Sequence, residues 1–217
     1  MRMDLGRITA KIDYLLSRDD VVHPPNVIAD WDAEGLREPL SDERLTPDER
    51  LLGSIAGRHM GQLDFYAAKD RYERLVDDSE TEWEGEHDWI CVGESELATT
   101  TAVLLHARTG ETVLYDSDAW DWGPWDNFIL VKESFAAFVD DVVLGLDYRR
   151  LYYQNWVELT AVLDSEDLEF PGIYGDPWYL LLREMHADLF GGQPVSRSRR
   201  KELVRRIEKY FEDPDES

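Results

Sequence analysis

The chain has 217 residues, 43% of them hydrophobic, and a formal net charge of −24 at pH 7. This length and composition suit one globular domain with an extension, or two small domains, with enough apolar residues to bury a core. The charge disfavours binding to nucleic acid or to an anionic membrane surface, and it favours a basic partner.

The N-terminal region begins with a clear helical pattern. Apolar residues at helical spacing between Leu5 and Leu16 predict an amphipathic helix. His23-Pro24-Pro25 is expected to stop it, because proline cannot continue a helix. Residues 26 to 45 are polar and weakly patterned, and they predict no element.

A second helix is signalled by a capping sequence. Thr46-Pro47-Asp48-Glu49 combines an N-cap residue, a first-turn proline and a capping-box acid, so we expect a helix from there to about Arg58. Residues 61–76 are ambiguous. They are compatible with a strand that begins near Leu63 or with a continued helix.

The middle of the chain predicts an antiparallel sheet. An acidic connection over 77–88 leads into a buried strand at 88–94. Residues 98–116 predict a hairpin, because two apolar, β-branched runs flank a short turn that contains a glycine. A fourth short strand is expected at 127–132.

The remainder predicts helices. Ser134 is an N-cap for a helix whose apolar stripe would be Phe135, Phe138, Val139, Val142 and Leu146. Residues 148–163 are helical in pattern. Asp176-Pro177 begins another helix that Gly191-Gly192 ends, and a basic last helix is expected over 196–213.

Charge is segregated along the chain. Between Leu75 and Asp147 there are 18 carboxylates, and the basic residues there are Arg108 and Lys132. The segment 197–209 is instead basic, with Arg197, Arg199, Arg200, Lys201, Arg205, Arg206 and Lys209. The acidic region is either a solvated face of the salt-adapted kind or a docking surface for a basic partner. The basic helix could fold back on it or pair with another copy.

One segment, YDSDAWDWGPWDNF at residues 115–128, combines carboxylates with indoles around Gly123-Pro124. A helix–loop–helix calcium loop is rejected, because Trp120, Asp121 and Asn127 occupy positions that need other residues. An irregular ion site and a sugar site remain open, without further support.

We favour a protein interface for this segment. One tryptophan is expected to pack under the loop, and the others to face a partner, because exposed Trp beside Asp is typical of binding hot spots. The predicted partner-binding residues are Asp116, Asp118, Trp120, Asp121, Trp122, Trp125 and Asp126.

Signatures of catalysis do not occur in the sequence. It has no HExxH pair, no GxSxG elbow and no phosphate-binding glycine loop. We therefore expect a non-enzymatic protein without a cofactor or a metal. The single cysteine, Cys91, has no Cys or His at zinc-ligand spacing, and we expect it to be a small buried apolar side chain.

Targeting signals are likewise missing from this sequence. The N-terminus lacks the apolar core of a signal peptide, and no apolar run approaches the length of a membrane span. A soluble, cytoplasmic protein is expected.

Residues 87–147 carry a resemblance to a known superfamily. The strand Trp89–Gly93, the hairpin Arg108–Tyr115, the strand Phe128–Val131 and the helix start Ser134–Val139 follow in that order. This order, with its "tG-x-V-y" hairpin and "S-F-x-x-F-l" helix, resembles the SMI1/KNR4, or SUKH, superfamily.

The resemblance implies an α+β fold with a curved, mainly antiparallel sheet flanked by helices. The SUKH-like domain would span 1–147, and 148–217 would be a helical C-terminal extension packed on it. Bacterial members are mostly immunity proteins that neutralise a cognate toxin, often a nuclease, and fungal members are interaction scaffolds.

Four functional hypotheses follow. The first is an immunity protein that binds a basic toxin through an acidic, Trp-rich surface. The second is a protein-interaction scaffold without a toxin. The third is a small-ligand-binding protein or enzyme with a pocket under the Trp-rich segment, and the fourth assigns the acidity to salt adaptation alone.

Overall fold

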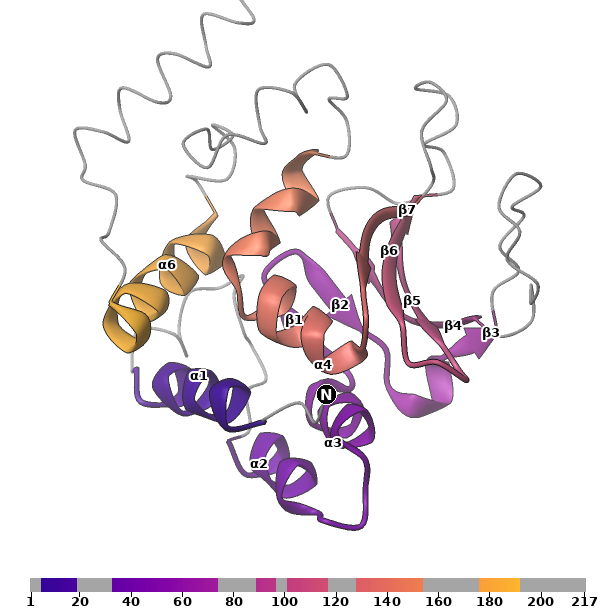
Figure 1. The fold of residues 1–217 in the computed structure, drawn as a ribbon, viewed down its shortest axis with the longest axis horizontal. Helices are drawn as coiled ribbons and strands as arrows, with labels where there is room; N and C mark the ends of the chain where they lie inside the picture. The colour runs from indigo at the N-terminus through magenta and orange to yellow at the C-terminus, as the bar shows by residue number, and fades with distance from the viewer. Residues whose placement is uncertain are drawn as a thin grey trace, which may run out of the picture.

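The protein forms an antiparallel sheet with helices on one side (Figure 1). The structure is a computed structural model, and it describes residues 5–18, 33–73, 89–96, 101–116, 128–153 and 176–191. The α+β class expected from the sequence is confirmed. No helix in these ranges is long and apolar enough to cross a membrane.

Seven strands make one sheet, in the order β1-β2-β4-β5-β6-β7, with β3 paired to β4 beside β2. All the pairings are antiparallel. The strands are β1 (Arg58–Met60), β2 (Leu63–Phe65), β3 (Tyr72–Glu73), β4 (Trp89–Ser95), β5 (Thr101–His106), β6 (Thr112–Asp116) and β7 (Phe128–Lys132). The four predicted strands are confirmed, and the ambiguous 61–76 stretch contains β2 and β3.

The helical layer is assembled from short elements. They are α1 (Gly6–Leu16), α2 (Ala33–Ser41), α3 (Pro47–Ile55), the 3-10 turn η1 (Ala68–Asp70), α4 (Phe135–Phe138), the π-helical turn η3 (Val139–Val143), the 3-10 segment η4 (Leu146–Tyr153) and α6 (Pro177–Phe190). The predicted N-caps Thr46, Ser134 and Asp176 all accept backbone N–H bonds from the first turns of their helices.

Several expectations for the helices were wrong in detail. Helix α1 ends at Leu16, before His23-Pro24-Pro25, since its apolar stripe ends there. Helix α3 ends at Ile55 rather than near Arg58, where β1 begins. Helix α2 was not expected, and Leu146 is exposed because the chain leaves the α-helical path at η3.

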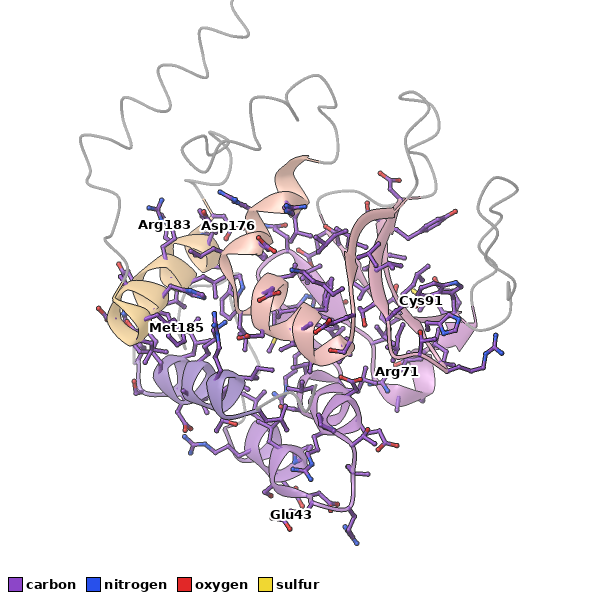
Figure 2. All side chains as sticks on the ribbon, viewed as in Figure 1. Glu43, Arg71, Cys91, Asp176, Arg183 and Met185 are labelled. Carbon is purple, nitrogen blue, oxygen red and sulfur yellow. The ribbon has the colours of Figure 1, made fainter. Side chains whose placement is uncertain are left out.

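Apolar side chains on the two sides of the sheet belong to two separate clusters. The main core joins the helices to the sheet side chains Phe65, Val92, Val103, Leu105 and Leu114. A second cluster on the opposite face contains Trp89, Cys91, Ala102, Leu104, Val113 and Tyr115. Figure 2 shows Cys91 on the side of the sheet away from the helices, and its predicted burial is confirmed.

A buried hydrogen-bond network fixes the start of α6. The Oδ1 atom of Asp176 accepts from the backbone N–H groups of Trp178 at 2.8 Å and Tyr179 at 3.2 Å. Its Oδ2 atom accepts from the Tyr148 hydroxyl at 2.7 Å. That hydroxyl accepts in turn from the N–H of Gln62, also at 2.7 Å. The N-cap of α6 thereby connects η4 to the turn between β1 and β2.

Side-chain donors from α1 and α6 bond backbone carbonyls at the π-helical turn η3. The wider i→i+5 pairing of such a turn interrupts the α-helical hydrogen-bond register. The bonds run from Lys11 Nζ to Asp140 O at 2.6 Å, from Trp178 Nε1 to Val143 O at 3.1 Å, and from His186 Nε2 to Leu144 O at 3.2 Å. These three bonds attach the turn to both neighbouring helices.

Two of these donors, Lys11 and His186, have pKa values below their ordinary values. Burial lowers the pKa of Lys11, and the bond to the Asp140 carboxylate offsets this only in part. Burial also lowers the pKa of His186, and the nearby positive charges of Lys11 and Arg7 lower it further. His186 is therefore neutral at pH 7, with the Nε2 proton donated to Leu144 O.

Replacing the buried cap Asp176 with alanine is expected to destabilise the protein by about 2–4 kcal/mol, because the helix loses its cap and Tyr148 loses its acceptor. Thr46→Ala, which removes an exposed cap, should cost only about 1 kcal/mol. Urea denaturation of both variants measures the difference. Equal costs would show that burial of the Asp176 network adds nothing.

Acidification is expected to destabilise the fold through His186. The folded-state pKa lies below the ordinary value of 6.5, so the unfolded chain binds the proton first, and stability falls as pH drops below about that value. His186→Gln keeps a donor for Leu144 O and removes the titration. The wild type should lose more unfolding free energy than the variant between pH 7 and pH 5, by at most about 1.4 kcal/mol per pH unit. Identical losses in urea denaturation would contradict this.

Candidate functional site

On the sheet face opposite the helices, directly paired residues of neighbouring strands form one cross-strand row, and part of this row is charged. The register pairs His59 with Asp64, Asp64 with Glu94, Glu94 with Ala102, and Ala102 with Tyr115. Directly paired residues project from the same face of a sheet. Since Ala102 and Tyr115 belong to the second cluster, the row is apolar over β5 and β6 and acidic over β2 and β4.

The acidic part of the row places like charges opposite each other. Asp64 and Glu94 face each other across β2 and β4, where Cβ atoms lie about 5 Å apart and like charges are destabilising. His59 Nδ1 lies 3.6 Å from Asp64 Oδ1 and 3.3 Å from Glu96 Oε1. A protonated His59 would offset part of this repulsion.

Two tyrosines border these carboxylates. The Tyr66 hydroxyl donates to Glu94 Oε2 at 2.7 Å. Burial, and then this bond, raise the pKa of Tyr66, so the phenol stays protonated and remains a donor. The Tyr72 ring lies 6.2 Å from the Tyr66 ring and is 49% exposed. We call His59, Asp64, Tyr66, Tyr72, Glu94 and Glu96 together the acidic patch.

The carboxylates of the patch lack cationic partners of the usual kind. In the part of the chain that the structure describes, no Lys or Arg forms an ion pair with Asp64, Glu94 or Glu96. Many carboxylates on the helical side are paired, as in Arg37–Asp13, Arg44–Asp42, Arg18–Glu184, Arg7–Asp140 and Lys132 with both Asp141 and Asp147. Negative charge is therefore less compensated on the patch than at those sites.

Lys132 is an example of such pairing between a basic side chain and nearby carboxylates. Burial lowers its pKa, but the hydrogen bonds to Asp141 and Asp147 raise it more, so the pKa lies above the ordinary value. Both bonds measure 2.8 Å. One of the two basic residues in the acidic 75–147 region is thus engaged with carboxylates of that same region.

Only one of the predicted partner-binding residues lies within the described ranges. Asp116 ends β6 and is 5% exposed, so its carboxylate is covered by the chain itself. Asp118, Trp120, Asp121, Trp122, Trp125 and Asp126 lie outside the described residues, and their role stays a prediction.

The Trp-rich segment nevertheless begins close to the acidic patch. Tyr115, one residue before the end of β6, lies in the same row as Asp64. Three strand spacings separate β2 from β6, or about 14 Å. The patch and the first residue of that segment therefore occupy the same end of the sheet.

Sequence reasoning missed the patch because its residues come from separate segments. The signal within β2 was the alternation of buried Leu63 and Phe65 with Asp64 and Tyr66, which marks a strand with one polar face. The pairing with Glu94, thirty residues later, was not visible.

Other candidate chemistry has little support. No group of His, Cys, Asp and Glu among the described residues has the arrangement of a metal site. His106 accepts from the Thr109 N–H through Nδ1 at 3.1 Å, within its own hairpin. Comparisons with protein-family models, curated proteins and solved structures gave no match.

Gly93→Ala is expected to disrupt the patch. A Cβ at Gly93 would collide with the backbone carbonyl oxygen of Asp64, which cannot move without breaking the β2–β4 pairing. Overpacking of this kind costs about 1–3 kcal/mol. Gly53→Ala in α3 meets only the Pro39 side chain, at 3.2 Å, and gains helix propensity. Urea denaturation should show a clear loss for the first variant and little for the second, and unchanged stability of Gly93→Ala would contradict the packing.

Proposed function

We propose that the chain is a non-enzymatic immunity protein that binds and neutralises a cognate toxin with a basic surface. The observation that carries the proposal is the acidic patch. Three carboxylates without Lys or Arg partners in the described chain lie beside two tyrosines, at the end of the sheet where the Trp-rich segment begins.

The like-charge pair Asp64–Glu94 supports a binding role. Opposed carboxylates lower the stability of the free protein, and this cost is relieved when a cation lies between them. Proteins retain such local conflicts mainly at functional sites. A basic partner would supply the missing positive charge.

The negative charge and the exposed aromatic rings would act on different steps of binding, the first on association and the second on dissociation. An acidic patch on a chain of net charge −24 steers a basic partner toward it and raises the association rate. Exposed aromatic rings such as Tyr72 slow dissociation once they are buried in the interface. A nuclease toxin has a basic substrate cleft, and an acidic surface can occlude it.

The order of elements is consistent with this reading. Strand β4, the β5–β6 hairpin, β7 and the Ser134-capped helix α4 follow in the order on which the SUKH resemblance was based. The bacterial members of that superfamily are mostly immunity proteins, and the proposal for this chain takes its toxin-binding role from there.

Neutralising the patch is expected to weaken protection against a co-encoded toxin. The triple variant Asp64→Asn, Glu94→Gln, Glu96→Gln should reduce the association rate at low salt by about tenfold or more, with a smaller salt dependence. Because it removes a repulsive pair, it should be at least as stable as the wild type. Growth of cells that express the toxin, together with stopped-flow association kinetics, measures the effect.

The matched control is Glu38→Gln, Glu43→Gln, Glu133→Gln, which changes the net charge equally at exposed positions elsewhere. It should protect like the wild type. A second double variant, Trp122→Ala with Trp125→Ala, should raise the dissociation rate. If the patch variant protects fully and keeps the wild-type salt dependence, the patch is not the binding surface.

A further inference from the structure

Helix α6 is attached to the end of η3 at two points. Near the start of the helix, the indole N–H of Trp178 donates to Val143 O at 3.1 Å. Two turns later, Nε2 of His186 donates to the next carbonyl, Leu144 O, at 3.2 Å. The indole keeps the same charge at every ordinary pH, whereas an imidazole can gain a proton near neutrality. The second attachment, unlike the first, can therefore respond to acid.

The end of α6 is also the more weakly packed part of the helix. Met185 is its last buried residue, and Leu189 and Phe190 are 37% and 47% exposed. The Asp188 carboxylate accepts from the Tyr14 hydroxyl of α1 at 2.7 Å, but this bond lies in solvent. Segments with few buried apolar contacts open locally at low cost in free energy. The last turn of α6 can therefore separate from α1 while the capped start of the helix stays in place.

Positive charge gathers around His186. Arg7 and Lys11 project from α1, and both pair with the Asp140 carboxylate of η3. The Arg7 guanidinium lies 4.6 Å and the Lys11 ammonium 5.8 Å from the centre of the Phe190 ring. The His186 ring lies 5.2 Å from that same ring. A protonated His186 would thus be a third cation beside one carboxylate, and like charges at such distances repel.

The other charged side chains of η3 and α6 are engaged elsewhere. Among the described residues, Asp140 is the carboxylate that offsets positive charge at His186. Protonation leaves the bond to Leu144 O in place, because Nε2 keeps its hydrogen, so acid changes the charge of the attachment rather than its donor. The engaged side chains are Asp141 with Lys132, Glu184 with Arg18, Asp188 with Tyr14, and Arg183 over the Tyr179 ring.

We propose that protonation of His186 releases the last turn of α6, residues 186–190, from α1 and η3. On release, the charged ring reaches solvent, and its repulsion with Arg7 and Lys11 is relieved. Phe190 loses the two cations that lie against its ring and becomes more exposed. This acid-sensitive attachment is a conformational device of the helical layer, and it does not depend on the proposed binding of a toxin.

The direction of the pH dependence follows from the two environments of His186. In the attached state, burial and then the positive charge of Lys11 hold the pKa of His186 below its ordinary value of 6.5. In the released state the ring lies in solvent, where its pKa is close to that value. The released state therefore binds the proton first. Release increases as the pH falls below about 6.5, by at most about tenfold per pH unit.

Amide hydrogen exchange of the full chain, followed by NMR at pH 7 and pH 5, tests the release. We expect the protection factors of the amides at 187–191 to fall by about tenfold between the two pH values. Those at Leu181 and Leu182, near the start of α6, and those at 51–55 in α3 should change much less. Nuclear Overhauser contacts between the Phe190 ring and the side chains of Arg7 and Lys11 should weaken in parallel.

Three variants assign the effect. His186→Gln keeps a donor for Leu144 O without the titration, and it should abolish the loss of protection at acidic pH. Arg7→Gln removes one neighbouring cation at a half-exposed position, and it should make that loss smaller. His59→Gln is the matched control, because it removes a half-exposed histidine from the sheet, and it should behave like the wild type.

Unchanged protection at 187–191 in the wild type would overturn the proposal. An equal loss at α3 and at the start of α6 would also overturn it, because acid would then unfold the whole domain rather than release one turn. A loss that persists in His186→Gln would assign the effect to another group. No toxin is used, so the release can fail while protection by the acidic patch holds, and the reverse.

Discussion

The architecture depends on the buried carboxylate of Asp176. It caps α6, accepts from Tyr148 in η4, and through that hydroxyl reaches the N–H of Gln62. The neighbouring Gly61 has φ +68°, and any side chain there would collide with Tyr148 and Trp178. The glycine therefore allows the β1–β2 turn to approach the helices closely. One carboxylate thus fixes the sheet relative to the helical layer.

The π-helical turn η3 is the second point at which distant segments meet. In this turn, the backbone carbonyl and the side-chain carboxylate of Asp140 both accept hydrogen bonds from Lys11, which is fully buried. A buried lysine without these acceptors would carry a large desolvation cost. Trp178 connects this turn to the first network, because its backbone bonds Asp176 and its indole N–H bonds Val143 O. Both networks therefore include Trp178, in the first turn of α6.

Local chemistry decided which features could be predicted from the sequence. The caps at Thr46 and Ser134 depend on residues three positions away, and both were found. Helix α2 was missed, since its interior Pro39 and few apolar residues give it almost no sequence signal. The register that pairs Asp64 with Glu94 depends on contacts between separate strands. The acidic patch could not be found from the sequence for that reason, whereas the acidic region as a whole could.

The placement of two acidic residues directly opposite each other distinguishes the patch from a generally acidic surface. Exposed carboxylates also occur on the helical side, at Glu38 and Glu43, where flexible side chains can move apart in solvent. On the sheet, the register of β2 and β4 places Asp64 and Glu94 directly opposite each other, with their Cβ atoms about 5 Å apart. Salt adaptation requires negative charge but no such opposition. In our proposal, a cationic side chain of a basic partner placed between these two residues would relieve their opposition, and the strand pairing would hold them in position before binding.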